Sequence, residues 1–387
     1  MPGLYIHIPF CQSKCRYCDF CSFAGLAHLI PRYVAGLARE AHLRAGLWRD
    51  IPFDTIYVGG GTPTLLSAEQ VEAVLTACGK ALDLSRVREA SIEANPGTVS
   101  LQQLAGLRQL GLDRISIGVQ SLRNDELRLL GRIHSANQAR EAVRMARKAG
   151  FGNVSLDLLF GLPRQTLDHW CETLQQALAE RPEHLSLYAL TLEKGTRLAQ
   201  AVARGALARP DDGLAADMYT WAAECLCEAG YVQYEISNWA LADQTAAGER
   251  SIVRTVCRHN LGYWHNARYL GLGVAAASYD GRTRSTNTRE IEEYLTRFEQ
   301  GLDATGEHET LDEAGRMGET MMLGLRLVRG VSWGSFERRF GVPMRSVYGR
   351  VIDRLCAQEL LEADARGIRL TARGRLLGNR VFAAFLP

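Results

Sequence analysis

The first half of the chain alternates between short apolar runs and longer amphipathic stretches, and this alternation strongly limits its fold. The apolar runs, rich in β-branched or aromatic residues, have the length of strands and cover residues 4–8, 55–58, 90–93, 114–119, 153–159 and 184–190. The stretches between them have the periodicity of amphipathic helices and cover residues 31–48, 68–82, 101–110, 136–148 and 167–178. Six strands separated by long helices predict βαβ units, and therefore an α/β domain with a parallel sheet.

The pattern changes after Glu193. A longer amphipathic helix is expected at 213–229 and a further strand at 231–236, whereas 241–256 is polar, poorly periodic and typical of a loop. From about residue 310 onward, the pattern predicts a compact and mostly helical block resembling a winged helix. Its expected elements are helices at 314–327, 333–340 and 344–358, a hairpin around 364–370 and a last helix to residue 385.

The chain length of 387 residues predicts two or three domains. We place them at 1–240 for the core domain, 241–309 for a connecting segment and 310–387 for the C-terminal domain. Lys and Arg number 45 against 43 Asp and Glu, a balance that argues against nucleic acid as a partner. The sequence contains no apolar run long enough for a transmembrane segment and no recognisable secretory signal, so we expect a cytoplasmic protein.

Four of the ten cysteines fall close together, at Cys11, Cys15, Cys18 and Cys21. In a reducing compartment such a group binds metal more often than it forms disulfides. Cys11, Cys15 and Cys18, just past the first strand, can hold one corner of a cubane iron–sulfur cluster and leave one iron open to another ligand. The alternative is a zinc site completed by Cys21, although zinc ribbons usually separate their cysteine pairs by a longer loop.

Polar signatures follow the ends of successive predicted strands, where the loops of a barrel or doubly wound sheet place functional groups. Taken singly, each of these residues is more often structural, but their joint placement favours a binding site. They are the glycine-rich loop with Gly60, Gly61 and Thr62, then Glu93, Gln120, Arg132 and Asp157.

A second group of candidate residues lies in the segment 257–264, which reads CRHNLGYW. Its imidazole, amide and aromatic rings suit an axial heme ligand with a porphyrin face packed on rings, although a lone histidine near aromatics is more often an ordinary core residue. The candidates are His259, Asn260, Tyr263 and Trp264. Because a polar loop and Gly262 flank His259, we expect its side chain to lie near the surface.

The pattern CxxxCxxC after a first strand resembles the signature of the radical S-adenosylmethionine (SAM) superfamily. The longer string YIHIPFC at 5–11 narrows the resemblance to its coproporphyrinogen oxidase-like branch of HemN and HemW proteins, and the resemblance runs over almost the full length. It implies a partial (β/α)6 barrel, a 4Fe–4S cluster on Cys11, Cys15 and Cys18, and SAM chelating the fourth iron. The HNxxYW pattern at 259–264 resembles the heme-binding motif of the HemW-type members.

The same resemblance implies roles for individual residues. SAM is expected near Tyr5, Tyr17, Gly60, Gly61, Thr62, Glu93, Gln120, Arg132 and Asp157, and heme near His259, Asn260, Tyr263 and Trp264. Two positions depart from the family pattern. Ala277 stands where a histidine is usual, which puts that histidine's role in doubt here, and Cys21 is an additional cysteine that we expect to be no ligand.

Three functions are compatible with this resemblance. The first is a heme chaperone that transfers heme to respiratory hemoproteins. It is favoured by the His259 motif and by a cluster motif only ten residues after Met1. The second is an oxygen-independent coproporphyrinogen III dehydrogenase, which uses a SAM-derived radical to convert two propionates to vinyl groups. The third is another radical SAM enzyme of this branch, such as a methyltransferase or cyclopropanase. Dimerisation, and peripheral membrane contact through the acceptor, are left open.

Overall fold

A curved sheet of mostly parallel strands organises the protein, as shown by a computed structural model that describes residues 2–243, 252 and 254–387. Within these residues the sheet has twelve strands in the order β14-β13-β12-β11-β1-β4-β5-β6-β7-β8-β10-β9. The six parallel strands at its centre match the predicted ones within a few residues. They are β1 (Gly3–Ile8), β4 (Thr55–Gly60), β5 (Glu89–Ala94), β6 (Arg114–Gln120), β7 (Asn153–Phe160) and β8 (His184–Ala189).

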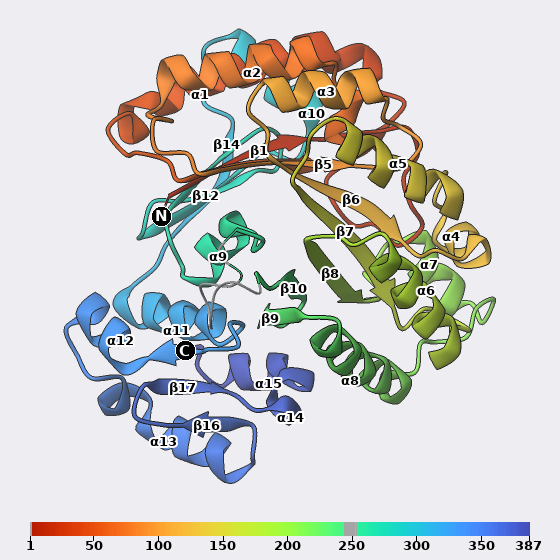
Figure 1. The fold of residues 1–387 in the computed structure, drawn as a ribbon. Coiled ribbons are helices and arrows are strands. Elements are labelled where there is room, and N and C mark those ends of the chain that lie inside the picture. The colour runs from red at the N-terminus through yellow and green to blue at the C-terminus, as the bar shows by residue number, and fades with distance from the viewer. Residues whose placement is uncertain (1, 244–251, 253) are drawn as a thin grey trace.

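The helices that connect these strands cover the convex outer face of the sheet (Figure 1). The longer ones bury an apolar stripe in the core, and several begin at a serine or threonine whose hydroxyl accepts from a backbone N–H of the first turn, as Ser67 and Ser135 do. The helices are α1 (Ile30–Trp48), α2 (Ala68–Ala81), α3 (Leu101–Gln109), α4 (Asn124–Leu130), α5 (Ala136–Lys148), α6 (Leu167–Ala179), α7 (Arg197–Ala203) and α8 (Asp212–Glu228). This architecture is the predicted α/β partial barrel.

Six further strands extend the sheet at its two ends. On one side β10 (Asn238–Leu241) pairs antiparallel with β8, and β9 (Tyr231–Glu235) pairs with β10. On the other side β11 (Tyr269–Leu272) runs parallel to β1, followed by three antiparallel strands. These are β12 (Ala277–Tyr279), β13 (Thr283–Asn287) and β14 (Thr305–Thr310), with α10 (Ile291–Glu299) before the last. Most of the predicted loop 241–256 lies outside the described residues.

The C-terminal region packs around its own apolar core, which includes Phe336, Ile352 and Ile368. Five helices and a small sheet of order β15-β17-β16 form it, and the single last helix predicted to residue 385 is two short helices, α14 and α15. The elements are α11 (Glu313–Gly324), β15 (Val331–Ser332), α12 (Trp333–Phe340), α13 (Met344–Ala357), β16 (Leu361–Ala363), β17 (Gly367–Leu370), α14 (Ala372–Leu376) and α15 (Gly378–Ala383). In the described part of the chain, no helix has the length and apolarity to cross a membrane.

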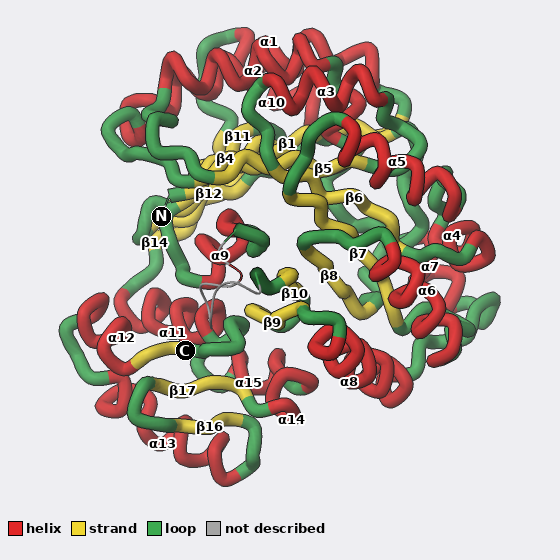
Figure 2. The backbone as a smooth tube through the Cα atoms, viewed as in Figure 1, coloured by secondary structure: helices red, strands yellow, loops and turns green. Residues whose placement is uncertain are grey.

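One short helix, α9 (Arg258–Trp264), lies on the concave side of the sheet. Figure 2 shows it between the curved strands and the C-terminal helices, so that it fills the centre of the molecule. Because α9 carries the candidate heme residues, its position decides how those residues can act.

Candidate active site

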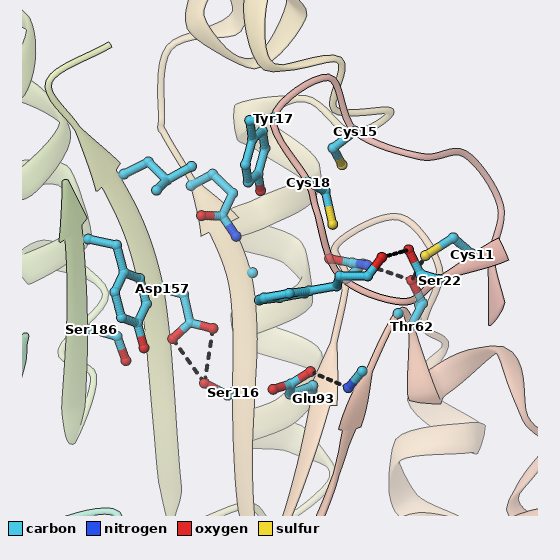
Figure 3. A pocket seen from close by; sticks show the side chains of 18 of the residues that line it. Cys11, Cys15, Tyr17, Cys18, Ser22, Thr62, Glu93, Ser116, Asp157 and Ser186 are labelled. Atoms are coloured by element: carbon cyan, nitrogen blue, oxygen red, sulfur yellow. Dashed lines mark hydrogen bonds between the residues drawn. The ribbon is translucent and has the colours of Figure 1, made fainter. Parts of the chain in front are cut away.

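A cavity of 400 Å³ opens at the carboxyl ends of the parallel strands. The thiols of Cys11, Cys15 and Cys18 line one side of it, and polar residues from β5, β6, β7 and β8 line the other sides (Figure 3). Parallel strands bring their carboxyl ends to one edge, which explains why residues more than a hundred positions apart converge here. The described residues that line the cavity include Tyr17, Gly60, Gly61, Thr62, Glu93, Gln120, Arg132 and Asp157, all predicted from the sequence.

The loop with the three cysteines is held by the short parallel pair β2 (Phe10–Cys11) and β3 (Phe23–Ala24). Lys14 closes the loop, because its Nζ donates to the carbonyls of Phe20 at 3.0 Å and Ser22 at 3.4 Å. Cys21 is turned elsewhere: its thiol donates to the carbonyl of Arg289 at 3.6 Å, and it is not among the residues lining the cavity.

The donor set fits a multinuclear cluster better than a single metal ion. Among the described residues, no three ligand-type side chains converge on one point where a lone ion could sit. A zinc site requires such convergence, whereas a cubane holds each thiolate on a separate iron at a different corner. Three separated thiols on one cavity wall, with Cys21 turned away, therefore suit the cluster and disfavour the zinc alternative.

The glycine-rich loop after β4 lets the backbone approach the cysteine loop closely. Gly60 has a φ of +122°, a left-handed conformation that favours glycine. At Gly61, an added Cβ would stand 2.7 Å from the carbonyl oxygen of Phe10 and 2.9 Å from the sulfur of Cys11. Any side chain at Gly61 would therefore displace the first thiol. Thr62 beside it points its hydroxyl at the same sulfur, 3.8 Å away.

Two half-buried carboxylates face the cavity from β5 and β7. Glu93 accepts from the hydroxyl of Tyr57 at 2.9 Å and from the amide of Gly60 at 3.0 Å, while the hydroxyl of Ser116 donates to both oxygens of Asp157 at 3.0 and 3.1 Å. Burial, and then the charge of Asp157, raise the pKa of Glu93 to about 7. Carboxylates in this setting can accept hydrogen bonds from ligand hydroxyls or pair with a ligand cation.

Gln120 and Arg132 complete the polar lining of the cavity. The β6–β7 register shifts just before Gln120, whose φ of +66° is unusual for a residue with a side chain. Such strain is found most often at functional sites. Arg132 follows α4 and donates from Nη1 to the sulfur of Cys15 at 3.5 Å, and from Nη2 to Asn95 and Gly118.

Sequence reasoning missed several residues that line the same cavity. Asn95, two residues after Glu93, donates to the hydroxyl of Thr62 at 2.7 Å and so ties two strand ends together. Its position in the string EANP at a strand end was a usable signal. Tyr188 and Ser186 on β8 gave none, because they read as ordinary strand residues. The further lining residues include Lys14, Tyr57, Arg114 and Ser116.

Tyr5 is the predicted SAM residue that does not line the cavity. Its hydroxyl shares a hydrogen bond of 2.9 Å with Nδ1 of His7, and its ring stacks on Tyr57 at a centroid distance of 6.2 Å. Since Tyr57 itself lines the cavity, Tyr5 supports the lining from behind.

The expected surface position of His259 is wrong, because the side chain is buried and only 3% of the residue is exposed. Its Nδ1 shares a hydrogen bond of 2.8 Å with the hydroxyl of Thr55, and its Nε2 shares one of 2.9 Å with the hydroxyl of Tyr263. Burial, followed by the charge of Arg114, lowers the pKa of His259 to about 3. The imidazole is therefore neutral and engaged at both nitrogens. In this arrangement it offers heme iron no free lone pair.

The four motif residues also point in different directions. Asn260 lines the cavity, whereas the ring of Tyr263 packs edge-on against Tyr269. The ring of Trp264 lies under the guanidinium of Arg326 in the C-terminal region, 4.4 Å from its centroid. The motif therefore does not form one heme-facing wall in this structure. Ala277, where the family usually has histidine, begins β12 and is not a cavity residue either.

Comparison with known proteins defines the class of this chain. A family model described as the radical SAM superfamily matches residues 5–177, and one described as the HemN C-terminal domain matches 311–377. The solved structure of coproporphyrinogen III oxidase HemN from Escherichia coli is similar over 99% of this chain and 90% of that one, with a TM-score of 0.84 and 25% identity. The fold is thus that of a radical SAM protein.

The curated relatives narrow this class further. Heme chaperone HemW of Bacillus subtilis is 35% identical over 100% of this chain and 99% of its own length. Heme chaperone HemW of Lactococcus lactis is 36% identical over 99% of this chain and 96% of its own. The mouse mitochondrial radical S-adenosyl methionine domain-containing protein 1 is 35% identical and covered to 87%. The chain belongs to the HemW family.

Proposed function

We propose that the protein is a heme chaperone that holds a SAM-liganded 4Fe–4S cluster, binds heme and passes it to acceptor hemoproteins of respiration. The observation that carries this proposal is the full-length similarity to relatives named heme chaperone HemW. The cavity with three thiols supports the cluster part of it.

In this proposal Cys11, Cys15 and Cys18 hold the cluster, and Cys21 is no ligand. When bound, the cluster supplies one open iron position and the capacity to exchange an electron. The chain's own residues fix the thiols: Lys14 holds the loop closed, and Gly61 leaves room for the first sulfur.

SAM is proposed to occupy the cavity beside the thiols. The backbone of Gly60 and Gly61 and the hydroxyl of Thr62 face its amino acid end, and the carboxylate of Glu93 accepts from its ribose hydroxyls. Gln120, Arg132, Asp157 and Tyr17 line the rest, and Tyr5 supports them from behind Tyr57. At 400 Å³ the cavity lies near the lower end of the roughly 300–1,000 Å³ usual for small-molecule sites, which leaves little room for a tetrapyrrole beside SAM.

Heme is proposed to bind outside that cavity, with His259 as axial ligand and Asn260, Tyr263 and Trp264 nearby. Since both ring nitrogens of His259 are engaged in the structure, ligation requires α9 to withdraw from the barrel first. Withdrawal breaks the hydrogen bond between Nδ1 of His259 and Thr55, and as a local opening it requires at most the free energy of global unfolding.

A coproporphyrinogen III dehydrogenase is the second candidate, favoured by the similarity to HemN over nearly the whole chain. One experiment separates the two functions. The cluster is reconstituted anaerobically, and heme binding, heme transfer to an apo-hemoprotein and decarboxylation of coproporphyrinogen are measured on the same sample. The chaperone predicts binding and transfer without decarboxylation.

A further inference from the structure

Arg132 has a position that SAM binding alone does not explain. It follows α4 directly, because Gly131 adopts a left-handed φ of +72° and the amide of Arg132 donates back to the carbonyl of Leu127 at 2.9 Å. This helix end also holds the cysteine loop, since the amide of Arg16 donates to the carbonyl of Leu130 at 2.9 Å. The backbone therefore fixes Arg132 relative to Cys15.

The guanidinium is fixed as firmly as its backbone. Nη2 donates to the amide oxygen of Asn95 at 2.5 Å and to the carbonyl of Gly118 at 2.6 Å. These two bonds leave Nη1 aimed at the sulfur of Cys15, 3.5 Å away. None of these three acceptors is a carboxylate, although Arg132 does act on Asp157, where burial raises the pKa and the charge of Arg132 lowers it by a smaller amount. A half-buried guanidinium that is always charged also requires a compensating negative charge in direct contact with it.

We propose that this negative charge is the thiolate-ligated cluster, so that Arg132 is a positioning residue that raises the reduction potential of the cluster through its hydrogen bond to Cys15. The inference rests on the proposed cluster and goes beyond a SAM contact. Adding an electron makes the cluster more negative, and a fixed cation beside a ligand sulfur stabilises that reduced state more than the oxidised one.

The test is a redox titration of the full chain, reconstituted anaerobically and free of SAM. Dithionite and mediators set the potential, and the electron paramagnetic resonance signal of the reduced cluster is the readout. Arg132→Gln should lower the reduction potential of the cluster. At a fixed applied potential, the ratio of reduced to oxidised cluster should fall about tenfold, which corresponds to a decrease in reduction potential of about 59 mV for one electron. Arg132→Lys, which keeps the charge, should shift it less. Arg128→Gln removes the same charge from an exposed position on α4 and should leave the potential unchanged.

Asn95→Asp provides a second test should Arg132→Gln lose its iron. A carboxylate at this position pairs with Nη2 and adds a negative charge, so the potential should fall while Arg132 is still present. An unchanged potential in an iron-replete Arg132→Gln or Asn95→Asp variant would overturn the inference and leave the proposed function intact. Failure of the wild-type chain to assemble any cluster would overturn both.

Discussion

At the scale of single residues, the cavity is shaped by how its half-buried charges are balanced. Glu93 and Asp157 repel each other across the space between β5 and β7, and each is stabilised by neighbouring hydroxyl or amide donors. Half-buried carboxylates with satisfied donors are costly to keep for packing alone. Their position is consistent with the proposed SAM site, whose ligand would supply hydroxyls and positive charge.

Glu93→Ala should weaken SAM binding about tenfold or more with the cluster retained. The loss leaves ligand hydroxyls unpaired in a closed site, at a cost of about 1–3 kcal/mol. Binding measured by calorimetry checks this, and Glu72→Ala, the same truncation at an exposed position on α2, is the matched control. Because the pKa of Glu93 is about 7, wild-type affinity should also fall as the pH drops below that value and the carboxylate is protonated. If Glu93→Ala binds SAM as tightly as wild type does, Glu93 is not part of the site.

Cys15→Ser should abolish the cluster, whereas Cys21→Ser should leave the iron content unchanged. The reason is that Cys15 lines the cavity while Cys21 donates to the carbonyl of Arg289 outside it. Iron and sulfide analysis after anaerobic reconstitution measures the difference. Loss of iron in Cys21→Ser would show that the site has four cysteine ligands.

The sequence predicted the cysteines and many of the polar strand-end residues of the cavity, because strand ends meet at one edge of a parallel sheet. It did not predict the environment of His259, because a single histidine in a polar segment gives no signal of burial. Its burial becomes visible only in the structure, where the ring shares hydrogen bonds with Thr55 on a distant strand and with Tyr263 on the next helical turn. Asn95 was missed although it lies beside a predicted residue.

At the scale of elements, α9 joins two parts of the molecule. At its start, the carboxylate of Glu89 accepts from the amides of Arg258 at 2.8 Å and His259 at 3.1 Å. Just past its end, Arg339 on α12 donates to the carbonyls of His265 at 2.9 Å and Asn266 at 2.7 Å. The barrel therefore holds one end of α9, and the C-terminal region holds the other.

Arg339→Gln should loosen α9 selectively. Cys257, fully buried just before α9, should react with a maleimide about tenfold faster or more, because hydrogen bonds from a charged donor contribute about 1.5–3 kcal/mol. Cys78, equally buried on α2, serves as an internal reference for global unfolding, and Arg338→Gln removes an exposed charge from the same helix. Labelling is quantified by peptide mass spectrometry. If Cys257 and Cys78 accelerate together, α9 opens only with global unfolding, and ligation of heme by His259 loses its route.

The strands that sequence reasoning missed share a physical cause. β13 is a polar run, TRSTN, and β12 has three residues, so neither shows the apolar alternation of a strand. Both form because β11 pairs with β1 along one edge and leaves its other edge for β12, which in turn pairs with β13. Such pairing depends on tertiary contacts, which local patterns do not contain.

At the scale of the whole molecule, the fold is similar to that of HemN, so the architecture alone does not separate a chaperone from a dehydrogenase. The difference lies in where a tetrapyrrole binds. A dehydrogenase must hold its substrate next to SAM, sealed from water, whereas a chaperone must hold heme where another protein can take it. The small volume of the cavity favours the second arrangement.

The most direct test follows heme and coproporphyrinogen on one anaerobically reconstituted, SAM-replete sample. The account predicts that bound heme gives a Soret band, and that His259→Ala shifts or diminishes this band while the cluster absorbance stays unchanged. Trp264→Ala should bind heme more weakly. Under reducing conditions the sample should form no vinyl product from coproporphyrinogen. Robust formation of the vinyl product, together with heme binding that is weak and insensitive to His259→Ala, would contradict the account and identify the protein as a dehydrogenase.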